Sequence, residues 1–449
     1  MSKNKNIILN SEYPRKLKDK FFLLGFFLLP SVPPLGFLML LISLILSILS
    51  KPYFNFDDKW NIPIFLSMGI IIFNTIYVSL INKPIELINF PISNIWVNLF
   101  NWIPFLIGFK WFQEYLNTHE KRYNFAKFLV SGTIPVLFSC FMQYVFKWEG
   151  PIELFNGFIV WFLKPVNAEG GISGLFSNTN YTGLWLVTTL PLSLFLIFIN
   201  HKKAQNNKKF LLVLISLLII FFIFQTNSRN ALLGVLLSLN IIFGIKAIIF
   251  LIFAIITFSW LFNYLSLPII NLETLNTIIP ETLISKFRDI KLDFYTPRIL
   301  IWGTAISMIL SKPLFGWGSG TFSFLYQNDN SFIPLLKINA THSHNLFFEL
   351  SHNFGLPLSL LLTSTFLLLI LKSFRKMYKC SDKFINSSIN KYWLASTSVI
   401  IFGHFSDITF YDGRINLLFC ILLSGTRCIL KDYENRNLQN SDYLRKSKA

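Results

Sequence analysis

The sequence is short of charge. Only 14% of its 449 residues are Asp, Glu, Lys or Arg, whereas soluble domains carry about 25%. So little charge cannot coat the surfaces of the two or three soluble domains that this length would otherwise form. With 53% hydrophobic residues, the composition excludes a water-soluble enzyme, a disordered chain and a coiled coil. A polytopic membrane protein remains.

Acidic residues and cysteines are also scarce. The chain has 22 Asp and Glu against 40 Lys and Arg, a net charge of +18. In a soluble protein this excess would indicate nucleic acid, but in a membrane protein it marks cytoplasmic loops, and we expect no nucleic-acid partner. The four cysteines have no metal-ligand spacing. Residues 1–20 are too polar for a cleavable signal peptide.

Long apolar runs dominate the rest. A helix of about 20 apolar residues crosses a bilayer, and lipid forces such runs to be helical. We therefore predict an all-α fold, a polytopic transmembrane helical bundle. The stretch 21–49 is interrupted by Pro30, Pro33 and Pro34. The uninterrupted runs are 62–81, 92–112, 126–146, 179–199, 210–226, 229–244, 247–264, 346–371, 392–405 and 414–430.

Basic clusters set the orientation. They lie in 1–20, 201–209, 372–391 and the C-terminal tail, which the positive-inside rule places in the cytoplasm. Lys121, Arg122 and Lys127 place 113–127 there too. An even number of crossings must then precede that loop, so 21–49 is expected to form a hairpin broken at its prolines, near Ser31–Pro34. The count becomes about twelve spans with both termini cytoplasmic.

The longest segment expected on the outer face is the loop 265–345. Within the large outer loop, 298–310 predicts an amphipathic helix on the membrane surface, with Ile299, Trp302, Ile306 and Ile309 on one side. A loop of that size usually carries function. The expected parts are 1–20, a cytoplasmic segment; 21–264, transmembrane helices; 265–345, the outer loop; 346–430, C-terminal transmembrane helices; and 431–449, a cytoplasmic tail.

Two arginines are expected on the outer face, against the positive-inside preference. Arg229 lies between two apolar runs. An arginine at membrane depth is normally paired or functional, although it can also snorkel at an interface. Arg298 opens the amphipathic helix, where an anion would feel the positive end of the helix dipole. The alternative for Arg298 is a solvated loop arginine.

His344 stands where the outer loop enters the run 346–371, and a neutral imidazole there can accept a proton from a hydroxyl. No carboxylate accompanies His342, His344 and His352 at a known ligand spacing. We therefore predict no metal and interpret His342 and His352 as loop or interface histidines. Asp407 and Asp412 are candidates for a general base or for counter-ions of the arginines, although a local pair of an aspartate with Arg414 accounts for them equally well.

Gly316, Gly318 and Gly320 form a glycine-rich segment after Lys312-Pro313. Backbone amides in such a segment can approach a phosphate. The segment lacks the lysine of a P-loop and follows no strand, so a flexible turn is the favoured interpretation.

At these residues the chain resembles the O-antigen ligase and O-antigen polymerase superfamily of bacterial membrane glycosyltransferases. One position departs from the ligase pattern, because Leu358 stands where that pattern has a final glycine. The pieces in family order are Gly174-Leu-Phe-Ser-Asn-Thr-Asn180, Thr226-Asn-Ser-Arg-Asn-Ala-Leu-Leu-Gly234, Pro297-Arg-Ile-Leu-Ile-Trp302, Lys312-Pro-Leu-Phe-Gly-Trp-Gly-Ser-Gly-Thr-Phe322, His344-Asn345 and Gly355-Leu-Pro-Leu358.

The resemblance implies an inner-membrane enzyme that moves a glycan from undecaprenyl diphosphate to a sugar hydroxyl on the periplasmic face. The acceptor would be a glycan or lipid A–core, with no metal, cofactor or nucleotide sugar. Arg229 and Arg298 match the arginines that hold the lipid diphosphate, and His344 matches the histidine that positions or deprotonates the acceptor. Ser228, Asn345 and Asp407 join the arginines as substrate-binding candidates.

The chemistry agrees with that implication. Negative charge develops on the leaving diphosphate, and guanidinium groups bind phosphate oxygens bidentately while remaining charged. Attack opposite to the diphosphate would invert the anomeric centre. Ligase, polymerase and protein O-glycosylation activities remain open.

Two other classes of function are compatible with the sequence. A transporter, including a bicarbonate-accumulation protein of the same superfamily, could use the arginines to bind an anion. Transporters usually place their site near mid-membrane on broken helices, whereas these candidates gather at one face. A flippase-like or scaffold protein of the same polysaccharide pathway would need no histidine at the loop–span junction.

The hairpin is tested by a reporter fused near Asp57. Two crossings in 21–49 place this position in the cytoplasm, so we expect a cytoplasmic reporter signal. A periplasmic signal would refute the hairpin and shift every later span.

Overall fold

The computed structural model describes residues 12–50, 58–166, 170–200, 206–246, 249, 297–328, 340–379, 389–407 and 409–446. Helices dominate this part of the chain, and the described strands are β1 (Ile152–Leu154) and β2 (Ile159–Trp161), which pair antiparallel. Seven of its helices are long and apolar enough to cross a membrane. The predicted all-α class is confirmed. The count of about twelve spans stays a prediction, and the run 247–264 lies almost wholly outside the described residues.

The N-terminal half holds α1 to α6. Short 3-10 or π turns at Tyr77–Ile81, Ile85–Leu87, Asn98–Asn101 and Phe112–Tyr115 join or extend these helices. The bounds are α1 Glu12–Leu28, α2 Pro33–Ser50, α3 Asn61–Ile76, α4 Ile92–Val97, α5 Ile103–Trp111 and α6 His119–Phe146.

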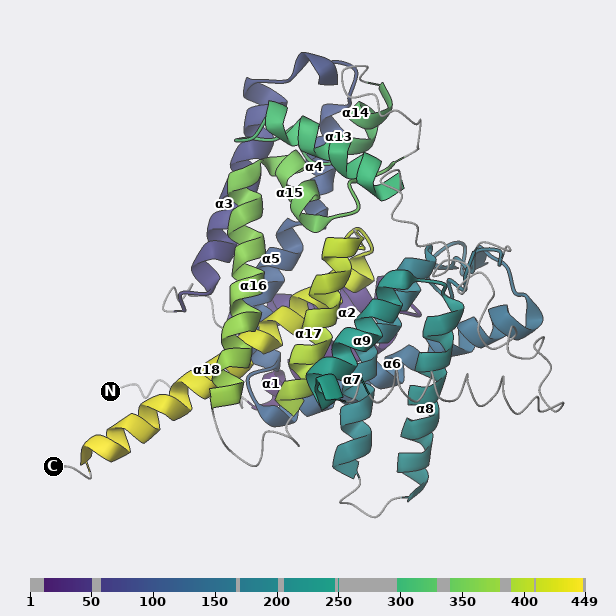
Figure 1. Ribbon diagram of the computed structural model, residues 1–449, viewed down its shortest axis with the longest axis vertical. Coiled ribbons are helices and arrows are strands. Elements are labelled where there is room, and N and C mark those ends of the chain that lie inside the picture. Colours follow the sequence, from purple (N-terminus) through teal and green to yellow (C-terminus); the bar gives the residue numbers. More distant parts are fainter. Residues whose placement is uncertain are drawn as a thin grey trace, which may run out of the picture.

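The described helices that follow have the bounds α7 Thr179–Asn200, α8 Asn206–Gln225, α9 Arg229–Phe243, α13 Pro297–Ser311, α14 Phe322–Asn328, α15 Leu346–Phe354, α16 Leu356–Lys379, α17 Ile389–Ser406 and α18 Gly413–Lys446. Helices α7, α9 and α17 pack together in the middle of the molecule, and α13, α14 and α15 lie at the top of the view beside α4 (Figure 1).

The proline-broken stretch 21–49 folds as two helices. Helix α1 ends at Leu28, and α2 begins at Pro33, where a proline in the first turn loses no helical hydrogen bond. Gly36 allows close packing, since a Cβ there would lie 2.6 Å from Leu29 Cα. The predicted break is present, and whether both arms cross the membrane stays a prediction.

The run 346–371, expected as one span, is divided at Gly355. Its φ of +89° ends α15, and α16 starts at the next residue. The glycine-rich segment holds the break: Trp317 N–H donates to His352 O at 2.7 Å and Gly318 N–H donates to Asn353 O at 3.1 Å. The sequence showed only continuous apolarity, whereas the division comes from these long-range bonds. The turn interpretation of the glycine-rich segment fits, because its amides bind protein carbonyls.

Helix α13 covers the amphipathic segment expected at 298–310. Its core face is Ile301, Ala305 and Met308, which are buried with α14 and the segment around α4. On the expected apolar side, Ile299 and Ile306 are 42% and 43% exposed. The helix is therefore apolar on two faces, and its outward face is suited to a membrane surface.

The role of Gly355 predicts a stability defect. We expect Gly355→Ala to lower the melting temperature in detergent, because left-handed backbone costs a non-glycine residue about 1–2 kcal/mol and a Cβ would overlap Leu314 O. Gly303→Ala is the matched control. It sits in α13 with nothing within 4 Å of an added Cβ, so it should melt as the wild type does or higher. Equal melting of both variants would contradict the proposed role of the break.

Candidate functional site

Asp407 is the centre of a polar cluster. It directly follows α17, and its side chain is 6% exposed. Its Oδ1 accepts a hydrogen bond from His344 Nδ1 at 2.7 Å. Its Oδ2 accepts from Asn180 Nδ2 at 2.6 Å and from Arg298 at 3.4 Å. One carboxylate therefore joins the first turn of α7, the first turn of α13 and the segment before α15.

The surroundings of Asp407 keep it ionised. Burial raises the pKa of its carboxyl, but the hydrogen bond and charge of His344, then the charges of Arg298 and His342, outweigh burial and lower that pKa. A carboxylate only accepts hydrogen bonds. The pairing therefore requires the proton of a neutral His344 to sit on Nδ1, which leaves Nε2 as an acceptor.

His344 is held in an uncommon backbone conformation, with φ of +53°. For a non-glycine residue such a conformation costs roughly 1–3 kcal/mol and persists only where neighbouring contacts fix it. Here Ser343 donates to Glu349 on one side, and Asn345 donates to Phe405 O at 2.7 Å on the other. The side chain of His344 is 27% exposed, so it is accessible to a ligand.

Arg298 lies beside the same carboxylate with donors to spare. Its Nη1 donates to Ser406 O at 3.0 Å and its Nη2 to Asp407. A guanidinium has five N–H donors, and this side chain is 39% exposed. The remaining donors can therefore bind an anion next to His344.

Arg229 begins the neighbouring helix α9. It is exposed and, within the described residues, none of the polar contacts involves its side chain. The start of α9 packs on α7 near Gly183, since a Cβ there would lie 2.9 Å from Ala231 Cβ. Arg298 and His344 thus share one carboxylate, whereas Arg229 stands at the start of a helix beside α7.

The other two predicted substrate-binding residues cap helices. Asn345 Oδ1 accepts from Phe347 N–H at 2.9 Å and Phe348 N–H at 3.3 Å. Ser228 caps α9 by accepting from Ala231 N–H at 3.4 Å. Capping explains both residue types, and substrate contact stays a prediction for each.

His342 lies in the loop before α15, as interpreted, whereas His352 does not lie in a loop or at an interface. The rings of His342 and His344 have centroids 4.3 Å apart, so His342 belongs to the cluster. Burial first, then the positive charges of His344 and Arg298, lower the pKa of His342 to about 4 despite Asp407. His352 is fully buried in α15 against Phe322. Spacing along the chain could not show either position.

His342, His344 and Asp407 also form the group that could hold a metal ion. Their candidate ligand atoms lie within 4.8 Å of one another, and a lowered pKa keeps an imidazole available as a ligand. Against a cation, both oxygens of Asp407 already accept hydrogen bonds, one of them from the cationic Arg298. These contacts suit a group in which Asp407 is the counter-ion of Arg298 and the hydrogen-bond partner of His344 better than they suit a metal centre.

Three residues in or beside the cluster were not identified as candidates from the sequence: Asn180, Glu349 and Tyr411. Asn180 stood in a quoted motif but was given no role. Glu349 carried a usable signal, because an acidic residue inside an apolar run is normally functional. Tyr411 carried none, since nothing along the chain places it next to Glu349 Oε1, 2.6 Å away.

The cluster lies at the opposite ends of α7 and α17 from two of the basic segments. Helix α7 starts at the cluster and ends at Asn200, directly before 201–209, and α17 begins at Ile389, near the end of 372–391, and ends at the cluster. At 1.5 Å per residue, a helix of about 20 residues separates its ends by about 30 Å. This arrangement is the one expected if the basic loops are cytoplasmic and the cluster is outside.

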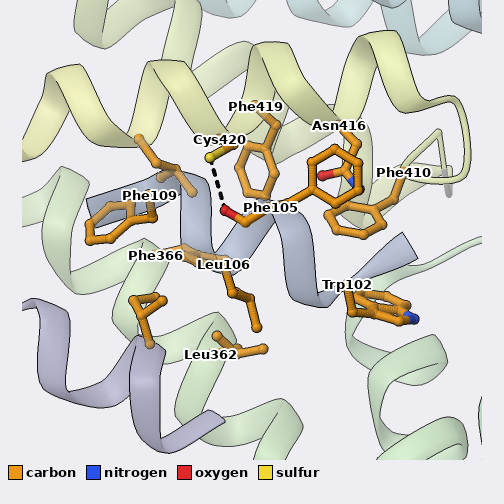
Figure 2. Close-up of a pocket in the computed structure, with 12 residues that line it drawn as sticks. Trp102, Phe105, Leu106, Phe109, Leu362, Phe366, Phe410, Asn416, Phe419 and Cys420 are labelled. Carbon is orange, nitrogen blue, oxygen red and sulfur yellow. Dashed lines mark hydrogen bonds between the residues drawn. The ribbon is translucent and has the colours of Figure 1, made fainter. Parts of the chain in front are cut away.

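An apolar pocket lies between α3, α5, α16 and α18 (Figure 2). Its polar lining residues are Cys420, whose thiol donates to Phe105 O at 3.0 Å, and Asn416, whose amide donates to Asn101 O at 3.0 Å. At one end Trp102 stacks on Phe410, with ring centroids 4.4 Å apart. Phe410 follows Asp407 by three residues, and no Asp, Glu, Lys, Arg or His lines the pocket.

Comparison with known proteins agrees with this geometry. A family model described as O-antigen ligase matches residues 179–363, a range that contains Asn180, Arg229, Arg298 and His344. Asp407 lies beyond it. No curated protein matches the chain. The match covers less than half of the chain and confirms the resemblance: residues 179–363 are similar to the O-antigen ligase family.

Proposed function

We propose that the protein transfers a glycan from undecaprenyl diphosphate to a sugar hydroxyl on the periplasmic face of the inner membrane. The observation that carries the proposal is the contact of His344 and Arg298 with one buried carboxylate, Asp407. A base and a cation held side by side are what this transfer requires, because a hydroxyl must lose a proton while a diphosphate gains charge.

The reaction balances on these groups. The acceptor hydroxyl gives its proton to His344 Nε2, and its oxygen forms a bond to the anomeric carbon of the donor sugar. The bond from that carbon to the diphosphate oxygen breaks, and undecaprenyl diphosphate leaves with the electron pair. Attack from the side opposite the leaving group inverts the anomeric centre. Asp407 stabilises the imidazolium that forms, as the aspartate does in other His–Asp pairs.

The arginines serve the leaving group. Arg298 is exposed beside the cluster, and Arg229 is exposed at the start of α9. Guanidinium groups bind phosphate oxygens in bidentate fashion and stay charged at every working pH. We propose that they supply the positive charge that a metal ion supplies in other diphosphate chemistry, so that the reaction proceeds without metal.

The acceptor is proposed to be lipid A–core or the end of a growing glycan. The description of the matched family favours a ligase, while Leu358 departs from the ligase pattern. Deletion of the gene separates the two. Uncapped core together with lipid-linked polymer identifies a ligase, and core capped by single repeats identifies a polymerase.

The proposal is tested by His344→Ala, Arg298→Ala and Arg229→Ala. We expect each to lower glycan transfer about 10²-fold or more, because general-base and charge-stabilising groups each contribute that much. Transfer is measured with purified protein and a synthetic undecaprenyl diphosphate glycan, and membrane insertion is checked by the reporter used above.

Lys312→Ala is a matched control, since this cation lies at the far end of α13, 4.5 Å over the Trp317 ring, and should transfer normally. Treatment with EDTA should leave the wild-type rate unchanged. Near-normal transfer by all three variants would sink the assignment. Uptake of bicarbonate by proteoliposomes, without transfer, would favour a transporter.

The pH dependence of His342→Gln is a separate prediction. Because the pKa of His342 is lowered to about 4, this ring is neutral throughout the range above pH 5 and gains a proton only below it. Glutamine keeps an acceptor for the His344 N–H, which donates to His342 Nδ1 at 3.4 Å. We expect the acid limb of kcat/KM between pH 5 and 8 to keep its midpoint. A shift of more than about one pH unit would show that His342 titrates there.

A further inference from the structure

Glu349 is a buried carboxylate next to the cluster. It lies on α15 and is 1% exposed. Its Oε2 accepts from both the N–H and the hydroxyl of Ser343, each at 2.9 Å. Its Oε1 accepts from Tyr411 OH at 2.6 Å and from Asn353 Nδ2 at 3.5 Å. Both oxygens are therefore held by hydrogen bonds within the protein.

The partners of Glu349 lie on the two sides of the His344–Asp407 pair. Ser343 directly precedes His344, and Tyr411 follows Asp407 by four residues. The Tyr411 ring also contacts His342, with centroids 6.2 Å apart. Glu349 therefore ties the segment that carries the histidine to the segment that follows the aspartate.

Stability alone does not account for this carboxylate. Its hydrogen-bond partners among the described residues are uncharged: a backbone amide, two hydroxyls and a side-chain amide. A buried polar side chain is costly to desolvate, and an apolar side chain of similar shape often packs as well or better. What a hydrogen-bonding side chain provides at this position, and an apolar one cannot, is a link between the two segments.

We propose that Glu349 is a positioning residue that holds His344 with Nε2 directed at the acceptor. This inference rests on the proposed transfer reaction. Glu349 touches neither substrate nor reacting atoms, and it acts through Ser343 and Tyr411. The positive φ of His344 makes such support necessary, because the segment would otherwise relax to an ordinary backbone conformation.

The test compares Glu349→Gln with Glu349→Leu. The glutamine oxygen can accept both Ser343 bonds, and its NH2 group can donate to Tyr411, whose hydroxyl can also accept. Leucine keeps the volume and removes every bond. We expect kcat to fall roughly 10²-fold in Glu349→Leu, the scale of an ångström-sized misplacement, and to stay within about threefold in Glu349→Gln. KM for the donor should change little in both variants.

Ser351→Ala is the matched control. Ser351 is buried on the same helix, but its hydroxyl bonds to Phe347 O and Ser359 Oγ, away from the cluster. It should transfer at the wild-type rate. A kcat near wild type in Glu349→Leu would overturn the proposal, and so would equal losses in Glu349→Gln and Glu349→Leu.

Tyr411→Phe keeps the inference testable if Glu349→Leu does not fold. It removes one donor, so kcat should fall several-fold, on the lower scale of geometric effects, with KM unchanged. An unchanged kcat in Tyr411→Phe would overturn the proposal.

Failure of the proposed transfer reaction would give a different pattern of variant activities from failure of the positioning role. If the wild type transfers no glycan, or if His344→Ala is fully active, the reaction itself is wrong. If His344→Ala is inactive while both Glu349 variants are fully active, only the positioning role is wrong.

Discussion

The interactions of Asp407 organise the candidate site. Its two oxygens accept from His344, Asn180 and Arg298, which come from three segments that are far apart in sequence. A carboxylate that is only 6% exposed meets little water, so the hydrogen bonds to its oxygens must come from protein donors. His344 and Arg298 are also the groups that the proposed transfer reaction would use. The buried charge thus fixes the geometry and favours the Nδ1–H form of the histidine.

The packing around the cluster explains why these segments meet. The bent element α15–α16 turns at Gly355, and the glycine-rich segment after α13 hydrogen-bonds to the carbonyls of His352 and Asn353 at the bend. Because α13 is fastened at that end, and its core face is buried with α14, Arg298 at its other end is carried to Asp407. The exposed apolar face of α13 leaves the same helix able to lie on a membrane.

The sequence predicted what depends on composition and local pattern. Low charge and long apolar runs predicted the helical membrane class, and the prolines predicted the break between α1 and α2. The spacing of apolar residues in 298–310 predicted α13. Arg298, His344 and Asp407 were named as candidates, but their contact was not, since it depends on packing between helices. The same limit hid the bend at Gly355, the place of His342 in the cluster, and the role of Asn180.

Glu349 could be predicted only in part. An acidic residue inside an apolar run indicates function. Its hydrogen-bond partners could not be predicted, because the packing of the bundle brings Ser343 and Tyr411 to it from other segments. The reverse holds for Arg229. The sequence identified it as a candidate for binding a diphosphate, but among the described residues its side chain forms no hydrogen bond or ion pair with the cluster.

The central claim is that His344 works as a base because Asp407 holds it. The turnover number of Asp407→Asn tests this most directly, in the transfer assay with purified protein. Asparagine keeps the shape but can present a donor to His344, which favours the wrong tautomer. The account predicts a fall of about 10²- to 10⁴-fold in kcat, with little change in the KM for the donor. A kcat within a few-fold of wild type would contradict it.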